Sequence, residues 1–447
     1  MRTEFTLAQL ADPDTAASEK ILRACVHCGF CTATCPTYVL LGDELDSPRG
    51  RIYLIKNMLE SGGPVGADTV KHIDRCLSCL ACMTTCPSGV HYMHLVDHGR
   101  RHIEAHYRRP WTERLLRHWL GRVLTQPSLM RAALRLARLA KPFRALFPKR
   151  LLPLVTLTPE VILAASPVDR PQIFPAEGER KMRVALLPGC AQQVLAPEIN
   201  EATIRLLTRL GADVAIAPGS GCCGALRHHL GEEGPALALA RANIDAWETA
   251  RAAGGLDAIV ANASGCGTML KDYGFLLRTD AAYAEKAARI AALARDVSEI
   301  VAELGLRAAG SAPRLRVAYH SACSLQHGQK IDREPKALLA AAGFEVVDVP
   351  EGHLCCGSAG TYNLLQPELA SALRDRKLAN IALTRADVVA AGNIGCITQL
   401  SGEAPVPVVH TVELLDWATG GPKPRGLSER VERDVARAAA RETNPAR

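Results

Sequence analysis

The N-terminal fold is decided by the segment Cys25-Val26-His27-Cys28-Gly29-Phe30-Cys31-Thr32-Ala33-Thr34-Cys35-Pro36. The same spacing recurs in Cys76-Leu77-Ser78-Cys79-Leu80-Ala81-Cys82-Met83-Thr84-Thr85-Cys86-Pro87. Both segments read C-x2-C-x2-C-x3-C-P, which is the bacterial ferredoxin pattern for 4Fe–4S clusters. Two copies with equal spacings predict a module that carries two clusters and transfers single electrons.

The predicted ligand sets cross between the two motifs. In two-cluster ferredoxins the fourth cysteine of each motif binds the cluster of the other motif. The first 4Fe–4S cluster is therefore assigned to Cys25, Cys28, Cys31 and Cys86. The second is assigned to Cys76, Cys79, Cys82 and Cys35. This crossing would hold together two loops that are distant in sequence.

Structural zinc is the main alternative for these cysteines, since zinc also uses C-x2-C pairs. Zinc sites usually place a long spacer between two pairs, which neither motif does. Disulfides fit less well, because clustered cysteines in a cytosolic chain usually indicate metal binding or catalysis. Residues 1–20 contain four acidic side chains, among them Asp12, Asp14 and Glu19, and no apolar core of a signal peptide. No apolar stretch reaches the roughly 18 residues of a membrane helix, so we expect a cytoplasmic protein.

The net charge of +7 is unevenly distributed. Residues 100–150 contain 14 Lys and Arg against only Glu104 and Glu113. Such a local excess could attract an anionic membrane surface or an acidic partner; a solvated set of linker helices is the alternative. Residues 100–150 are therefore a candidate for peripheral contact with the inner face of the cytoplasmic membrane. No nucleic-acid partner is expected, because no fold or aromatic platform supports one.

The regions around the motifs read as helical. Ser47 as N-cap, Pro48 at the first position and Gly62-Gly63 after the end predict a helix between the motifs. This helix favours a helical ferredoxin module over a compact hairpin type. Four histidines recur every fourth residue from His94 to His106 and predict a helical stripe, interpreted as a surface face rather than a metal site. Five prolines within 151–180 indicate an extended connector.

The C-terminal half contains an internal repeat of cysteines. The first set is Cys190, Cys222, Cys223 and Cys266, and the second is Cys323, Cys355, Cys356 and Cys396. The first interval is 32 residues in both sets, and each adjacent pair is followed by glycine. Such self-similarity predicts duplicated domains.

Each repeat alternates expected strands and helices, which argues for a parallel sheet covered by helices. In the first repeat we expect strands near 183–187, 213–217 and 257–262, and helices near 198–210 and 235–250. Each cysteine group then follows the carboxyl end of a strand, the edge where open α/β sheets bind ligands. Each set is therefore a candidate ligand set, which gives one or two further iron–sulfur clusters. Buried or disulfide-paired cysteines are the alternative.

Gly219, Gly221 and Gly224 fit G-x-G-x-x-G, the pattern of a dinucleotide site. The second repeat lacks the middle glycine, so what recurs is Cys-Cys-Gly and not the nucleotide fingerprint. The expected fold is mixed, with an N-terminal α-helical ferredoxin module followed by two duplicated α/β domains with parallel sheets. The expected domains are a two-cluster ferredoxin domain (1–110), a basic helical linker and Pro-rich connector (111–180), a first Cys-Cys-Gly domain (181–310), and a second with a charged tail (311–447).

Beyond these motifs, the chain resembles the iron–sulfur subunits of bacterial glycolate oxidase (glycolate dehydrogenase). The segments that carry the resemblance are 21–38, 40–56, 263–267 and 353–362. The resemblance implies that FAD-containing flavoprotein subunits of the same complex oxidise glycolate or D-lactate. This chain would accept electrons singly and pass them towards a membrane acceptor, expected to be quinone, with no catalytic residue of its own.

Three alternatives remain open at this level. The first is the iron–sulfur subunit of another flavin dehydrogenase, acting on D-lactate or glycerol 3-phosphate. The second is a thiol redox subunit, because the Cys-Cys-Gly repeats also resemble those of heterodisulfide reductases. In those proteins the last group is typically C-x2-C, whereas Met269 and Gln399 stand at the second position here. The third is a zinc-scaffolded binding module.

Overall fold

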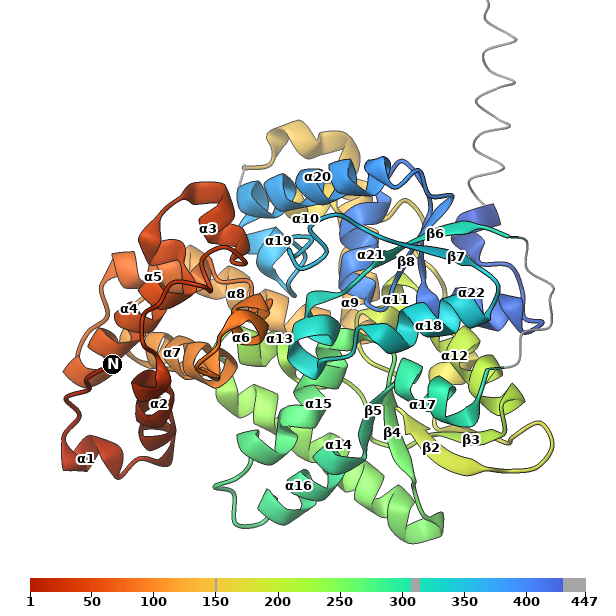
Figure 1. The fold of residues 1–447 in the computed structure, drawn as a ribbon, viewed down its shortest axis with the longest axis horizontal. Coiled ribbons are helices and arrows are strands. Elements are labelled where there is room, and N and C mark those ends of the chain that lie inside the picture. The colour runs from red at the N-terminus through yellow and green to blue at the C-terminus, as the bar shows by residue number, and fades with distance from the viewer. Residues whose placement is uncertain (149–150, 307–313, 429–447) are drawn as a thin grey trace, which may run out of the picture.

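The N-terminal part of the chain is a cluster of short helices (Figure 1). The computed structural model describes residues 1–148, 151–306 and 314–428. The expected tail after 428 and the expected domain boundary near 310 lie outside these ranges. The N-terminal elements are α1 (Leu7–Leu10), α2 (Pro13–Ala24), α3 (Pro36–Leu41), η1 (Glu44–Asp46), α4 (Pro48–Ser61), α5 (Ala67–Asp74), α6 (Ala81–Thr85) and α7 (Tyr92–His106).

Helix α4 lies between the two cysteine motifs, as the sequence predicts. Ser47 Oγ accepts a hydrogen bond from the Gly50 amide at 3.0 Å, and Gly62 ends the helix in the left-handed conformation. The buried face of α4 packs on α7 and forms the core of the N-terminal module. The two cysteine loops are thus held on a helical scaffold.

Helix α7 carries the histidine stripe, and its interpretation as a surface face is wrong for two members. His94 Nε2 hydrogen-bonds Asp272 Oδ1 at 2.7 Å, and its ring stacks on Phe275. His98 Nδ1 hydrogen-bonds Ser18 Oγ at 2.7 Å. His94 and His98 therefore connect α7 to neighbouring elements of the structure. The spacing of the histidines alone does not predict these contacts.

A helical linker follows, with α8 (Trp111–Leu124), α9 (Pro127–Ala140), η2 (Lys141–Leu146), α10 (Leu152–Thr156) and η3 (Pro167–Asp169). Helices α8 and α9 pack against each other, and α9 contacts η2 and α10. Several large apolar side chains of this linker are exposed: Trp111, Leu115, Trp119, Leu136, Leu139, Phe143 and Leu146. Among the described residues, no helix is both long enough and apolar enough to cross a membrane.

The first α/β unit is built on a five-stranded sheet with the order β1-β3-β2-β4-β5. Strands β2, β3, β4 and β5 run parallel, whereas β1 pairs antiparallel with the edge strand β3. Strand β1 therefore brings part of the expected connector into the sheet. The elements are β1 (Gln172–Phe174), β2 (Met182–Leu186), α11 (Gln192–Leu195), α12 (Glu198–Arg209), β3 (Ala212–Ile216), α13 (Ala225–His229), α14 (Glu233–Gly254), β4 (Ala258–Ala261), α15 (Ser264–Leu276), α16 (Ala284–Leu293), β5 (Ala294–Asp296) and α17 (Val297–Leu304).

The second α/β unit has a four-stranded parallel sheet with the order β7-β6-β8-β9. This is the strand order of the first sheet without β1. The elements are β6 (Arg316–His320), the π-helical turn η4 (Ser324–Gln329), α18 (Arg333–Ala341), β7 (Glu345–Asp348), α19 (Tyr362–Leu365), α20 (Pro367–Leu383), β8 (Val388–Ala391), α21 (Ile394–Ser401), β9 (Val408–His410) and α22 (Thr411–Ala418).

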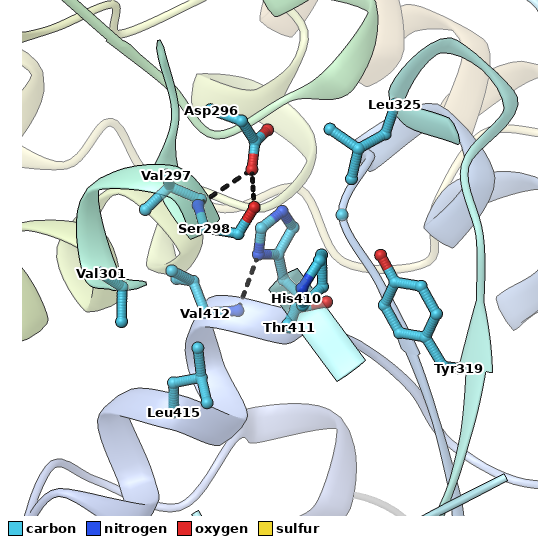
Figure 2. Close-up of a pocket in the computed structure, with 12 residues that line it drawn as sticks. Asp296, Val297, Ser298, Val301, Tyr319, Leu325, His410, Thr411, Val412 and Leu415 are labelled. Atoms are coloured by element: carbon cyan, nitrogen blue, oxygen red, sulfur yellow. Dashed lines mark hydrogen bonds between the residues drawn. The ribbon is translucent and has the colours of Figure 1, made fainter. Parts of the chain in front are cut away.

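The two α/β units share one apolar core, because α12 of the first packs on α22 of the second. His410 Nε2 also hydrogen-bonds Asn262 O at 2.8 Å across the interface. Figure 2 shows a small cavity between the two units, which is lined by Asp296, the cap of α17, and by the side chains of Tyr319 and His410. The shared core therefore holds the two units, and with them the edges of the two sheets, in one relative orientation.

Candidate metal centres

The first ferredoxin motif encloses a small cavity of about 30 Å³. Its lining includes Cys25, Cys28, Cys31 and Cys86, the four predicted ligands of the first cluster, and Cys82 also borders it. Gly29 adopts a φ of +87°, and a Cβ there would lie 2.6 Å from Arg49 Nη1. The left-handed backbone therefore favours glycine at this position. Its Cys28 is exposed, so this site lies at the protein surface.

The second motif gathers buried thiols. Cys35, Cys76, Cys79 and Cys82 are all buried. Burial raises the pKa of the Cys79 and Cys82 thiols well above the usual range, and the like charges of Cys35 and Cys76 raise both further. The predicted crossing of Cys35 to this motif is thus spatially feasible.

Arg51 is a buried cation beside this second site. Its Nη1 lies 3.7 Å from Cys35 Sγ, and its Nε donates to His72 O at 2.7 Å. Its Nη2 lies 3.2 Å from Asp46 Oδ1, and both side chains are almost completely buried. A fixed positive charge here offsets the negative charge of thiolate ligands. Four converging thiols with such a neighbour fit an anionic iron–sulfur cluster.

The two Cys-Cys-Gly sets face one large cavity. Each cysteine group follows the carboxyl end of a strand, because β2, β3 and β4 lead to the first set and β6, β7 and β8 to the second. The cavity has a volume of about 520 Å³. Its lining includes all eight cysteines: Cys190, Cys222, Cys223, Cys266, Cys323, Cys355, Cys356 and Cys396. The sequence predicts convergence within each set, whereas the shared cavity comes from the packing of the two units.

The thiols of the first set contact one another through hydrogen bonds. Cys222 accepts from Cys190 and Cys223, and these bonds lower the pKa of the Cys222 thiol well below its usual range. The Gly224 amide also lies 3.4 Å from Cys222 Sγ. Asn243 fixes the loop, since its Nδ2 donates to Cys222 O at 2.8 Å. Four thiols that three strand ends bring to one cavity can share one metal centre.

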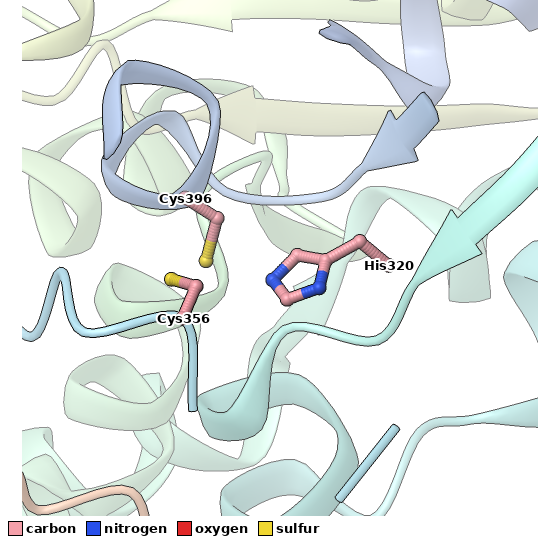
Figure 3. Close-up of side chains that lie close together, drawn as sticks. All are labelled: His320, Cys356 and Cys396. Carbon is pink, nitrogen blue, oxygen red and sulfur yellow. The ribbon is translucent and has the colours of Figure 1, made fainter. Parts of the chain in front are cut away.

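The thiols of the second set also contact one another. Cys323 and Cys355 have their Sγ atoms 3.7 Å apart, and Cys356 contacts both Cys355 and Cys396. His320 lies beside the last two thiols, with its ring nitrogen and the Cys356 and Cys396 sulfur atoms all within 4.8 Å of one another (Figure 3). Sequence reasoning missed His320. The only available signal was its place in the repeat, where Leu187 stands at the matching position of the first copy.

The second ferredoxin site lies against the second Cys-Cys-Gly set. Cys79 and Cys355 belong to one apolar cluster, together with Leu77 and Tyr362. Tyr362 Oη donates to Arg75 O at 3.1 Å, which links α19 to the second cysteine loop. Cys79 is also near enough to Cys323 for that thiol to raise the pKa of Cys79. All sixteen cysteines lie in the described residues and are free thiols. The ligand assignment of both ferredoxin sites and of both Cys-Cys-Gly sets stays a prediction.

The outer wall of the large cavity is apolar and is formed by the linker. Its lining side chains include Leu116, Trp119, Leu120, Val123, Leu124, Met130, Leu134, Leu154 and Leu157. Trp119 is 52 % exposed, so the cavity reaches the surface between these helices. The cysteine thiols thus line one side of the large cavity, and the apolar side chains of the linker line the opposite side.

Comparison with known proteins agrees with these motifs. A 4Fe-4S dicluster domain matches residues 21–90, and a cysteine-rich domain matches twice, at 184–271 and 317–401. The chain is 44 % identical over 419 residues to the glycolate oxidase iron-sulfur subunit of Escherichia coli (strain K12), which covers 94 % of this chain and 99 % of that protein. It is 33 % identical over 447 residues to the probable glycolate oxidase iron-sulfur subunit of Bacillus subtilis (strain 168), again with 94 % and 99 % covered. Lactate utilization protein A of Bacillus licheniformis is 28 % identical over 242 residues, which is 53 % of this chain.

Proposed function

The chain belongs to the family of glycolate oxidase iron–sulfur subunits, and on this premise we propose that it is the electron-transfer subunit of a complex that oxidises glycolate. The oxidation itself is assigned to an FAD-containing flavoprotein partner. Iron–sulfur clusters bound at the thiol sites supply one-electron transfer. The single observation that carries the proposal is the continuity of these sites, from the exposed Cys28 loop through Cys79 to Cys355 and the large cavity.

We place the flavoprotein contact at the first ferredoxin loop. Cys28 is exposed there, and the side chains of Val26 and Phe30 are 67 % and 63 % exposed. Solvent-exposed apolar side chains around a redox site are typical of a docking surface for a protein partner. Electrons would therefore enter at the surface and leave at the cavity, where the two Cys-Cys-Gly sets are inferred to be duplicated cluster domains.

The acceptor is proposed to be a membrane quinone. A quinone has an apolar tail and a small polar head, and the large cavity offers an apolar wall opposite buried thiols. The linker helices that form the wall also expose Trp111, Leu136 and Leu139 beside basic residues such as Arg138. Apolar and basic side chains together suit the surface of an anionic bilayer. The linker is thus proposed both to rest on the membrane and to admit the quinone.

A Cys28→Ser change tests the relay in the complex with the flavoprotein. The change removes one thiol of the proposed entry site. Glycolate should still reduce the flavin, whereas reduction of a water-soluble quinone analogue should stop. Ser88→Ala alters a neighbouring side chain of the same cavity without removing a thiol, and it should keep full turnover. Quinone turnover that survives Cys28→Ser would contradict the relay.

An Ala137→Trp change tests the acceptor site separately. Ala137 lines the apolar wall of the cavity, whereas Ala132 on the same helix is exposed and does not line it. Tryptophan at 137 should fill the space and slow quinone reduction at least about tenfold. Ferricyanide reduction should continue, and Ala132→Trp should leave both rates unchanged. Equal rates of quinone reduction in the two variants would show that the quinone does not bind in this cavity.

Lactate is the second candidate substrate, because lactate utilization protein A is also similar to this chain. That similarity covers only about half of the chain, so glycolate is the first choice. The flavoprotein co-purified with this chain should turn over glycolate faster than D-lactate or glycerol 3-phosphate. A thiol–disulfide function would require vicinal thiols of Cys222-Cys223 or Cys355-Cys356 that can be alkylated in active protein.

A further inference from the structure

His320 ends strand β6 and is 2 % exposed. Neither of its ring nitrogens has a hydrogen-bond partner among the described residues. Leaving a buried polar group without a partner destabilises a protein, so such a group requires an explanation. In Figure 3 the ring faces the sulfur atoms of Cys356 and Cys396. One of the two unpartnered nitrogens thus lies on the side of these thiols.

The other two buried histidines of this unit behave differently. His410 Nε2 hydrogen-bonds Asn262 O at 2.8 Å, and its Nδ1 accepts from Val412 N at 3.1 Å. His327 Nδ1 hydrogen-bonds Thr84 Oγ1 at 2.8 Å, and its Nε2 is 3.1 Å from His353 O. His320 therefore stands apart from the buried histidines around it.

The geometry suits a metal. On one tetrahedral ion with ordinary bond lengths, a nitrogen and a sulfur ligand lie about 3.5 Å apart and two sulfur ligands about 3.8 Å apart. The His320 nitrogen and the Cys356 and Cys396 sulfurs are all within 4.8 Å of one another. The three side chains already face one another (Figure 3).

This donor is present in only one of the two repeats. Val184 matches Val317 and Cys190 matches Cys323, which places Leu187 opposite His320. Leu187 is buried and cannot bind a metal. The first set thus has four thiols, and the second has four thiols and an imidazole.

We propose that His320 is a nitrogen ligand of the iron–sulfur cluster in the second Cys-Cys-Gly set, next to Cys356 and Cys396. The proposal rests on the proposed function, in that the second set binds an iron–sulfur cluster. A neutral imidazole adds no negative charge at iron, so the reduction potential is higher than with a thiolate at position 320. The histidine would thus make the second set more oxidising than a cysteine at the same position would, which favours electron transfer from the adjacent Cys79 site.

The test is nitrogen hyperfine spectroscopy on anaerobically purified protein labelled with 15N-histidine. After partial reduction, one EPR signal should carry the strong coupling of a directly bound nitrogen. Cys396→Ser should remove that signal, which assigns it to the second set. His320→Cys should keep the iron, lose the nitrogen coupling and lower the midpoint potential of that signal. His320→Leu, which copies the first repeat, should also lose the coupling, whereas the control His410→Gln should keep it.

Each other result overturns the proposal. A signal from the second set without nitrogen coupling in the unmodified protein excludes His320 as a ligand. Coupling that persists in His320→Cys assigns the nitrogen to another residue. Zinc in place of iron in the second set, with both ferredoxin signals intact, excludes a cluster there. Failure of the proposed function would look different, because the ferredoxin signals themselves would be missing or would not respond to glycolate.

Discussion

Replacing Arg51 by methionine should lower the reduction potential of the second ferredoxin cluster. Arg51 is fully buried, and its Nη1 is 3.7 Å from Cys35 Sγ. The added electron spreads over the cluster, whose centre would lie about 6 Å from the guanidinium. With an effective dielectric constant of about 20, the lost attraction is about 3 kcal/mol. For one electron this corresponds to a potential lower by about 120 mV.

The same change also breaks a buried ion pair. Asp46 would lose Arg51 and keep only Arg75 and His72 as neighbours. Removing one partner of a buried pair typically costs about 3–5 kcal/mol of stability. The double variant Arg51→Met/Asp46→Asn removes both charges, so its loss of stability and its shift in potential should both be smaller.

The assay is a redox titration followed by EPR, on the single variant, the double variant and the unmodified protein. Iron content and thermal unfolding are measured on the same samples, so that loss of the cluster is not mistaken for a shift. An unchanged potential in a single variant that keeps both clusters would show that Arg51 does not stabilise the reduced second cluster. A shift to higher potential would likewise contradict this role of Arg51.

Three further changes are expected to have defined effects. Burial raises the pKa of Asp296 to about 6, so the folded state binds a proton more tightly than the unfolded state, and stability should fall as pH rises from about 4 to about 6. Asp296→Asn should keep the cap of α17, remove this pH dependence and stabilise the protein by on the order of 2 kcal/mol at pH 7. The difference in unfolding temperature between pH 5 and pH 7, measured on both proteins, would reveal or exclude this effect. Gly29→Ala places a side chain next to Arg49 on a backbone with a φ of +87°, and the strain should cost about 1–2 kcal/mol of stability. The variant should therefore lose iron to a chelator faster than the unmodified protein. Equal rates of iron loss would show that the loop tolerates a side chain. Leu136→Ser/Leu139→Ser should weaken co-sedimentation with anionic vesicles and leave ferricyanide turnover intact, and unchanged sedimentation would remove these residues from the membrane contact.

Local patterns predicted much of this structure, since the cysteine spacings, the cap at Ser47 and the strands before each Cys-Cys-Gly group depend on neighbouring residues. The shared cavity could not be predicted, because it depends on how α12 packs on α22. The antiparallel strand β1 has only three residues in a Pro-rich segment, too few for a pattern. His320 lacked a signal for a similar reason, because a single histidine has no spacing of its own. The surface interpretation of His94 failed because its partner Asp272 is far along the chain.

We expect electrons from glycolate to pass through this chain. The most direct measurement mixes the anaerobic complex of this chain and its proposed flavoprotein partner with glycolate, freezes samples over time and records EPR spectra. The native complex should show reduced ferredoxin-type signals, and Cys28→Ser should lose the signal of the first site while the flavin is still reduced. A flavin that is fully reduced by glycolate beside clusters that stay oxidised would contradict this electron transfer.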